Sequence, residues 1–267
     1  MGVNPTVSRI TIYPVKSLDG IFVNRAKIGK SCLLHDREYA ILDSNNRFIN
    51  GKSNALVHSL RSKIDLENET ISFRHDSEVL WKAFHLQNEK PAINDYLSGF
   101  FNEPATFSQN KEGRFMDIPD IAGLTVVSTA SLESVAAWFG DMDMEEVRKR
   151  FRATIEISAV PAFWEDKLFI EEGTAIEFKI GNATILGISP RARCVVPTRH
   201  PQTGETIHAF PKIFARGRAD TIPSWSALER YGHSYYLTVN CYIPPSESGK
   251  WIETGDEIKI TGRRITR

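Results

Sequence analysis

The segment 189–198 places a cysteine beside two arginines. Cys194 follows Arg193 directly, and Arg191 lies two positions before Arg193. A thiol acts as a nucleophile or a soft-metal ligand only as the thiolate, and neighbouring cations stabilise that form. The arginines can also hold an anionic group beside the sulfur. The turn formers of 200–205 would end a strand close to the sulfur, so the segment is typical of a site for a metal complex that carries phosphate.

The same segment also has an ordinary structural explanation. Free cysteine is among the residue types that are most often buried, where it behaves as a small apolar side chain. On these residues alone, the favoured interpretation of Cys194 is therefore a buried cysteine in a strand.

Other charged clusters stand beside apolar strands. Lys16 and Ser17 adjoin at a strand end, where a lysine can act as a point charge for phosphate and a serine as a hydrogen-bond donor. A solvated lysine beside a turn-forming serine is the alternative. Arg37 precedes one apolar strand, and Arg150 with Arg152 precedes another. The latter pair can also be read as the basic end of a helix, which complements the helix dipole.

The composition is that of an ordinary globular protein. The chain has 267 residues, 41% of them hydrophobic and 25% charged, and its formal net charge is zero. A neutral balance gives no broad footprint for nucleic acid or an anionic membrane, and no stretch approaches the length of a transmembrane helix. Three widely spaced cysteines, with no apolar segment typical of a secretory signal at the start, lead us to expect a cytoplasmic protein without a disulfide framework.

The pattern of the chain predicts a mainly β fold with some helix. Short antiparallel strands with intervening turns fill the first hundred residues, including a hairpin about the turn 43–46 and another joining 63–66 to 70–74. Helical spacing is expected in 92–101, 128–139 and 144–149. Further strands are predicted in the second half of the chain, over 153–158, 175–180, 183–188, 235–242 and 257–260. We therefore expect two β-rich units of barrel or sandwich type, with the helical stretch between or beside them.

Seven segments, in order along nearly the whole chain, resemble the motifs of the MOSC superfamily, which is named after the C-terminal domain of molybdenum-cofactor sulfurases. The match is to members that carry an N-terminal MOSC-associated β-barrel domain before the MOSC domain. The segments are the YPVKSxxG-like 13–20, the DRxW-like 34–39, the helix start 124–132, the RFRPNI-like 150–155, the FAED-like 163–166, the RCxxTTxDPxTG-like 193–205 and the closing 255–260.

The resemblance implies a MOSC β-barrel, 116–267, packed with a barrel-like N-terminal domain, 1–115. It also implies a bound molybdenum cofactor, in which molybdopterin carries the metal. Cys194 would be the catalytic residue and the thiolate ligand of molybdenum. The family's cofactor-binding positions match Lys16, Ser17, Arg37, Arg152 and Arg193. Pyridoxal phosphate binding is a further association at the level of the family.

The resemblance implies a molybdenum-dependent oxidoreductase that reduces N-hydroxylated small molecules. Electrons would come from a separate ferredoxin-, haem- or flavin-type protein, since no ferredoxin cysteine pattern is present. A sulfur carrier with a persulfide on Cys194 is the alternative, and a barrel that has lost its cofactor is a third. Thr154 and His200 depart from the family's Asn and Asp, which leaves the substrate open, and His200 adds a titratable group near the site.

Overall fold

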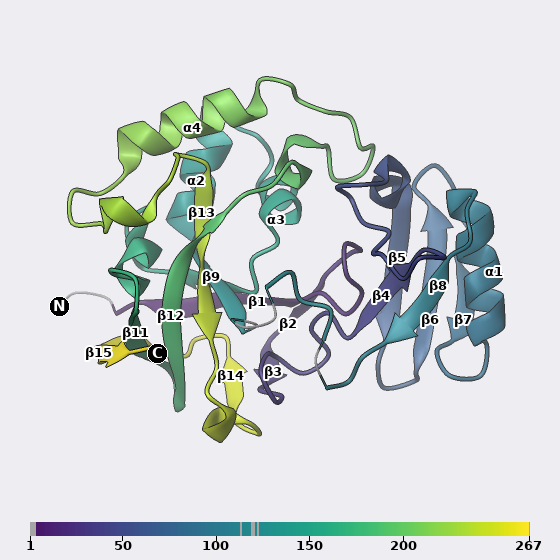
Figure 1. The fold of residues 1–267 in the computed structure, drawn as a ribbon, viewed down its shortest axis with the longest axis horizontal. Helices are drawn as coiled ribbons and strands as arrows, with labels where there is room; N and C mark the ends of the chain where they lie inside the picture. The colour runs from purple at the N-terminus through teal and green to yellow at the C-terminus, as the bar shows by residue number, and fades with distance from the viewer. Residues whose placement is uncertain (1–3, 113, 119–120, 122, 267) are drawn as a thin grey trace.

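The computed structural model describes residues 4–112, 114–118, 121 and 123–266, and its largest element is an eight-stranded sheet (Figure 1). Neighbouring strands are antiparallel except for β9 and β10, which are parallel and connected through two helices, as a parallel pair requires. The strand order is β15 (Ile258–Ile265), β11 (Thr174–Ile180), β12 (Ala183–Ala192), β13 (Tyr236–Tyr242), β9 (Leu124–Ser128), β10 (Ile155–Ser158), β1 (Thr6–Ile12) and β2 (Ile21–Val23).

Backbone hydrogen bonds between the two ends of the chain curl this sheet into a barrel. The Val7 amide donates to the Asp256 carbonyl at 2.9 Å, and the Ile258 amide donates to the Pro5 carbonyl at 2.8 Å. The start of β15 therefore returns to β1, six strands away in the sheet order. Inward side chains of these strands, such as Ile10, Ile155 and Val239, form one fully buried apolar core. The mainly β fold predicted from the sequence is confirmed.

Three helices cover the outside of the barrel: α2 (Thr129–Trp138), α3 (Met144–Phe151) and α4 (Phe210–Thr221) (Figure 1). The first two were expected, and Ser128 caps α2 by accepting a hydrogen bond from the Ser131 amide at 3.1 Å. No helix was expected over 210–221. It forms because Phe210 and Phe214 are buried against α2 and α3 in a second apolar cluster, so tertiary packing stabilises a segment of modest helix propensity.

The N-terminal part of the chain forms two small sheets with their own core. One sheet joins β5 (Leu60–Asp65), β6 (Thr70–His75) and β7 (Lys82–His85), which confirms the second expected hairpin. The other pairs β4 (Tyr39–Leu42) with β8 (Thr106–Gln109), and the helix α1 (Lys90–Phe101) packs against this unit. The turn 43–46 is present, and 47–49 returns along β4 through a bridge from Phe48 to Leu42 and a hydrogen bond from the Ile49 amide to the Ile41 carbonyl at 2.9 Å, so the first expected hairpin is also present, in a short form.

Strands from before and after residue 115, the expected domain boundary, pair with one another. β1 and β2 belong to the barrel sheet, and β3 (Arg25–Lys27) pairs with β14 (Trp251–Glu253) near the far end of the chain. The division into 1–115 and 116–267 stays a prediction. The remaining short elements are the 3-10 turns η1 (Ala55–Ser59), η3 (Trp164–Leu168), η4 (Val196–Thr198), η5 (Leu228–Arg230) and η6 (Pro245–Glu247).

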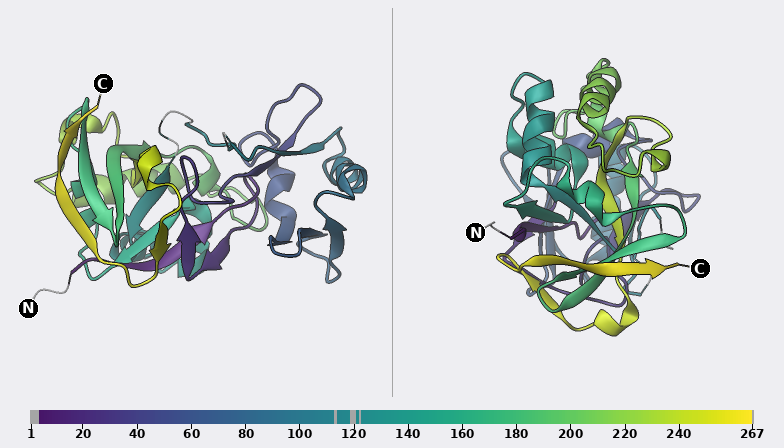
Figure 2. Two further views of the ribbon diagram at one scale, coloured as in Figure 1. Left: turned by 90° about the horizontal axis from the view of Figure 1, so that it is seen from below. Right: turned by 90° about the vertical axis from the view of Figure 1, so that its left-hand side faces the viewer.

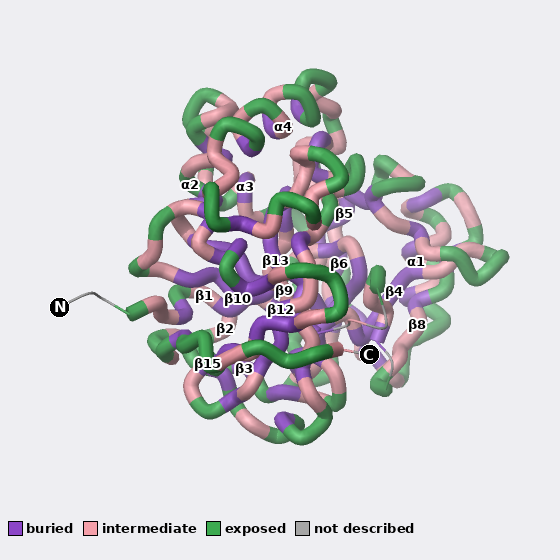
Figure 3. The backbone as a smooth tube through the Cα atoms, turned by 60° about the vertical axis from the view of Figure 1, so that its left-hand side comes forward, coloured by how far each residue is buried: buried purple, intermediate pink, exposed green. Residues whose placement is uncertain are grey.

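The two units lie side by side, with the barrel at one end of the long axis and β4–β8 with α1 at the other (Figure 2). Inner strands such as β9 and β10 are mostly buried, whereas β15 is mostly exposed at the border of the sheet (Figure 3). None of the helices in the part of the chain that the structure describes has the length and apolar character needed to cross a bilayer.

Candidate functional site

A cavity of about 560 Å³ lies where the two units meet. Its walls come from the loop after β1, from the linker that precedes β9, from the end of α3 and from the end of β12. All six residues singled out from the sequence line this one cavity: Lys16, Ser17, Arg37, Arg152, Arg193 and Cys194. The structure therefore brings together residues up to 178 positions apart (194 − 16), and their roles toward a cofactor stay predictions.

Cys194 is exposed, in contrast to Cys32 and Cys241. β12 ends at Ala192, two residues before the cysteine, and the turn η4 begins at Val196. The interpretation of Cys194 as a buried strand residue, favoured on its segment alone, is therefore wrong, because the strand stops before the thiol. The sulfur faces a water-accessible cavity.

Lys16 is held by an acidic residue that the sequence analysis did not single out. Its Nζ donates to the Phe115 carbonyl at 2.8 Å and to Asp117 Oδ1 at 2.6 Å. The other carboxylate oxygen of Asp117 accepts from Arg191 at 3.1 Å. Burial opposes ionisation of Asp117, but the charge and hydrogen bond of Lys16, together with the charges of Lys52 and Arg191, outweigh it and hold the carboxyl pKa below its ordinary value. Asp117 thus joins cations from both units across the cavity.

Arg37 is paired with a buried carboxylate. Its guanidinium donates to both oxygens of Asp36, at 2.7 and 2.5 Å, and Asp36 also accepts from the Tyr13 amide at 2.8 Å. Burial lowers the pKa of Arg37, but the charge and hydrogen bonds of Asp36, together with the charges of Tyr13 and Asp117, outweigh it and raise the net value. The guanidinium groups of Arg37 and Arg152 lie 4.6 and 4.1 Å from the centre of the Tyr13 ring, a cation–π arrangement that fixes both side chains.

Three of the six residues have left-handed backbone conformations. The φ angles are 70° for Ser17, 50° for Arg37 and 55° for Arg152. A side chain other than glycine costs energy in this region, and such residues gather at functional sites where the surrounding structure holds them. Arg152 has a local reason, because it ends α3 as its C-cap. Ser17 and Arg37 lie in turns, where a left-handed residue also helps to close the turn: the Leu18 amide, for example, donates to the Val15 carbonyl at 3.2 Å.

Arg193 carries an unsatisfied donor. One terminal nitrogen donates to the Phe151 carbonyl at 2.8 Å, whereas its Nε is buried without a hydrogen-bond partner among the described residues. Burial lowers the pKa of Arg193 to about 10, and repulsion from Arg191 adds to this effect. An anionic group in the cavity would accept a hydrogen bond from this Nε and offset the repulsion between Arg193 and Arg191.

The lining of the cavity is strongly basic. Among the described residues, one carboxylate, that of Asp117, faces eight cationic side chains: Lys16, Arg37, Lys52, Arg150, Arg152, Arg191, Arg193 and Arg230. Concave surfaces lined by one sign of charge concentrate ligands of the other sign. A soft sulfur ligand beside a basic cavity fits a phosphate-bearing metal complex, as expected from the sequence.

The two departures from the family pattern lie in different places. Thr154 lines the cavity, and its Oγ1 lies 3.4 Å from that of Thr125. His200 is not among the lining residues, and its Nε2 lies 3.8 Å from a carboxylate oxygen of Glu146. The titratable group expected beside the site therefore lies against α3, outside the lining of the cavity.

The FAED-like segment lies in the packed interior. Asp166 pairs with Arg218, a guanidinium that is 1% exposed, and Glu165 accepts from Ser131 Oγ at 2.9 Å. Burial, followed by repulsion from Asp166, raises the pKa of Glu165 to about 7. These carboxylates connect η3 to α2 and α4 behind the site, so their motif serves packing.

Comparison with known families agrees with this geometry. The profile of the MOSC N-terminal beta barrel domain matches residues 4–91, and that of the MOSC domain matches residues 120–259. The chain belongs to the MOSC family. Both matched regions contribute walls to the cavity, and the second contains Arg152, Arg193 and Cys194.

Curated relatives of this MOSC protein carry the name molybdenum cofactor sulfurase. Those of Caenorhabditis briggsae and Caenorhabditis elegans are 23% and 21% identical over 96% and 97% of the chain, which covers 36% of each relative. The human protein is 22% identical over 78% of the chain, which covers 28% of its length. The chain thus spans about a third of these relatives. The solved structure of the YuaD protein from Bacillus subtilis aligns with 99% of the chain at 12% identity and a TM-score of 0.38.

Proposed function

We propose that the large cavity binds the molybdenum cofactor, with Cys194 as the thiolate ligand of the metal. The observation that carries this proposal is an exposed thiol in a cavity with eight cationic side chains and one carboxylate among its described lining residues. Thiolates suit soft metal centres, and arginine and lysine suit phosphate. Among the predicted cofactor-binding residues, Arg152 and Arg193 are the cations that form no ion pair with a carboxylate of the described chain, which makes them the foremost candidates to hold the phosphate.

The proposed activity is reduction of N-hydroxylated small molecules. The bound cofactor would supply the redox chemistry, while this chain provides the thiolate, orients the pterin and compensates its charge. Burial raises the pKa of Cys32 to about 12 and also raises that of Cys241, so these two thiols are poorly suited to redox work. Electrons would come from a separate carrier of ferredoxin, haem or flavin type.

A sulfur-handling role is the second candidate. The exposure of Cys194 supports it, since a persulfide on this sulfur would be accessible to a partner. The names of the curated relatives, which are molybdenum cofactor sulfurases, point in the same direction. The cationic lining favours the first candidate, because a persulfide carrier has no need of phosphate-binding residues in both units.

The decisive experiment is metal analysis with pterin fluorescence on protein from a host that makes the cofactor. We expect molybdenum and pterin in equal amounts in the wild-type protein, and loss of the metal in Cys194→Ser, with unchanged folding because the thiol is exposed. Cys32→Ser is the matched control and should retain both. A fully loaded Cys194→Ser protein would overturn the ligand assignment.

An activity assay separates the two candidates. The loaded protein is given a chemical reductant and an amidoxime or an N-hydroxylated purine. Cys194-dependent reduction supports the reductase. Absence of turnover at full molybdenum occupancy would favour the sulfur-handling role.

A further inference from the structure

Cys194 lies in a loop, so its position depends on contacts that reach this loop from other elements. Before the cysteine, the Arg193 amide donates to the Tyr235 carbonyl at 2.9 Å, next to the start of β13. After it, the turn η4 is closed by local bonds such as that from the Thr198 amide to the Val195 carbonyl at 3.0 Å. Local bonds set the shape of this turn, whereas its place beside the cavity requires a partner from outside the loop.

Arg150 of α3 is such a partner. Its Nη1 donates to the carbonyls of Pro197 and Arg199, each at 2.7 Å. The rest of the guanidinium faces Glu146 of the same helix, to which Nε donates at 2.9 Å and Nη2 at 2.6 Å. Arg150 is only 1% exposed. The planar fork of an arginine can make these four bonds together, whereas a lysine ammonium in the same place acts as a point charge.

Arg193 makes a similar bond in the opposite direction. One of its terminal nitrogens donates to the Phe151 carbonyl at the end of α3, at 2.8 Å. The helix and the loop therefore exchange side-chain-to-backbone hydrogen bonds, one through residue 193 and the others through the turn that follows Cys194. The cysteine lies between these attachments.

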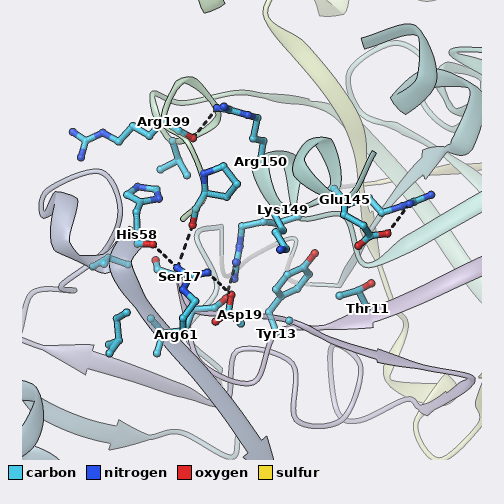
Figure 4. A pocket seen from close by; sticks show the side chains of 18 of the residues that line it. Thr11, Tyr13, Ser17, Asp19, His58, Arg61, Glu145, Lys149, Arg150 and Arg199 are labelled. Atoms are coloured by element: carbon cyan, nitrogen blue, oxygen red, sulfur yellow. Dashed lines mark hydrogen bonds and ion pairs between the residues drawn. The ribbon is translucent and has the colours of Figure 1, made fainter. Parts of the chain in front are cut away.

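Arg61 of β5 holds the far end of the same loop. It donates to the Pro201 carbonyl at 3.2 Å and to Asp19 at 3.0 Å, and it is buried. Figure 4 shows Arg61 beside Asp19 and, above them, the bond from Arg150 to the backbone of Arg199, around a smaller cavity that both arginines line. The N-terminal unit thus supports the position of the loop as well.

The thiol that this arrangement fixes has two cations beside it. Burial lowers the pKa of Arg191 and of Arg193, and the charge of Cys194 partly offsets this effect in both. Such an influence requires the sulfur to lie near both guanidinium groups, because Coulomb interactions weaken with distance.

We propose that Arg150 is the positioning residue for Cys194, which it keeps among the cations of the large cavity by fixing the turn that follows the cysteine. Arg150 acts through the backbone of the loop rather than on a ligand. The inference rests on the proposed function only in taking Cys194 as the working thiol, which the reductase and the sulfur-handling role share.

The test compares two thiol reagents on the cofactor-free, full-length protein. Dithiobis(nitrobenzoate) is anionic, and dithiodipyridine is neutral at neutral pH. Cys32 and Cys241 are buried, so Cys194 accounts for the fast reaction. Cations beside the sulfur attract the anionic reagent. The ratio of the two rate constants, anionic to neutral, therefore reports whether Cys194 lies among them, and in the wild-type protein it should fall with added salt.

Arg150→Lys keeps the charge but loses the fork that spans the two carbonyls. We expect the ratio to fall about tenfold in this variant, because the thiol leaves its cations. A general loosening of the fold would change both rate constants alike and leave the ratio unchanged. Arg148→Lys is the matched control on the same helix: Arg148 donates to Glu145 and to both oxygens of Glu156, so its ratio should equal that of the wild type.

Glu146→Ala gives a second measurement, which decides the question if Arg150→Lys does not fold. It removes the carboxylate that orients Arg150. Loss of a negative charge would by itself raise the ratio, so a fall reports a displaced thiol. The proposal is overturned if the wild-type protein shows no preference for the anionic reagent, if the ratio is unchanged in the folded variants, or if Arg148→Lys lowers it equally.

The outcome is separate from that of the metal analysis, because neither reagent needs a cofactor. A wild-type protein without molybdenum would refute the proposed function and leave the role of Arg150 standing. A loaded wild-type protein whose reagent ratio does not depend on Arg150 would do the reverse.

Discussion

Asp117 accepts a hydrogen bond from Lys16 at 2.6 Å, across 101 residues of sequence. Lys16 was expected to bind the phosphate of a cofactor, yet this ammonium group already has a carboxylate and the Phe115 carbonyl as acceptors. Burial lowers the pKa of Lys16, and the charge of Asp117 only partly offsets this effect. An anionic ligand that approaches Lys16 therefore competes with Asp117.

Replacing Asp117 by Asn should strengthen anion binding in the large cavity. The substitution removes the negative charge near Lys16 and Arg191 but keeps the shape of the side chain. We expect about tenfold tighter binding of inorganic phosphate, measured by calorimetry. Asp95→Asn, exposed on α1, is the control. Weaker binding would show instead that Asp117 holds Lys16 in its binding position.

The acidic partner of Lys16 also shows where the sequence stops being informative about the site. The six predicted residues lie in motifs whose order along the chain is recognisable. Asp117 lies in the linker before β9, outside those motifs, and reaches Lys16 only because the two units pack together.

Two helical glycines should respond in opposite ways to substitution by alanine. A Cβ at Gly217 in α4 would lie 2.3 Å from the Trp138 ring, whereas one at Gly99 in α1 meets nothing within 4 Å. Gly217→Ala should destabilise the protein by about 1–3 kcal/mol through overpacking. Gly99→Ala should stabilise it by about 0.5–1 kcal/mol through helix propensity. Urea denaturation of both variants checks the pair, and equal effects would contradict the described packing of α2 on α4.

Glu38 should make the stability sensitive to acid. Burial opposes its ionisation, but hydrogen bonds from His35 and Gln109 and the charge of Arg114 prevail and lower its pKa from 4.5 to about 2. A lowered folded pKa means that the stabilisation is present above the unfolded value and is lost as the pH falls toward 2. Between pH 5 and pH 3 we expect a loss of about 2 kcal/mol from this group.

The measurement is urea denaturation at both pH values, with Glu38→Gln for comparison. The variant is less stable at pH 5, because Arg114 loses its partner, but its stability should change less with pH. An identical pH dependence in the two proteins would exclude Glu38 as the titrating group.

Truncating Arg218 should be among the costliest single changes. Arg218 is 1% exposed, and it pairs with Asp166 and donates to Tyr231 Oη at 3.0 Å. Arg218→Ala leaves the buried carboxylate of Asp166 without its cation, which typically costs about 3–5 kcal/mol. Arg216→Ala, exposed on the same helix, controls for helix propensity and should be nearly neutral. Comparable losses in both variants would show that the ion pair contributes little.

Local signals explain which elements of the fold could be predicted. The cap at Ser128 and the left-handed Gly140 mark the two ends of α2, and the Gly181-Asn182 turn marks the hairpin of β11 and β12. The partners of β4 and β1 could not be inferred in this way. β4 pairs with β8 more than sixty residues later, and alternation of apolar residues indicates a strand without naming its neighbour. Likewise, α4 depends on burial of Phe210 and Phe214 rather than on a repeating pattern.

The position of β1 has a consequence for how the protein is made. β1 is synthesised before the other strands of its sheet, yet its neighbours β10 and the 255–258 segment are synthesised about 150 and 250 residues later. β1 can pair early with β2, but its other edge stays without a partner until β10 and the 255–258 segment have been made. Contacts of such long sequence separation slow folding and lengthen the exposure of aggregation-prone surface, so we expect the yield of active protein to respond to chaperone supply and to the rate of synthesis.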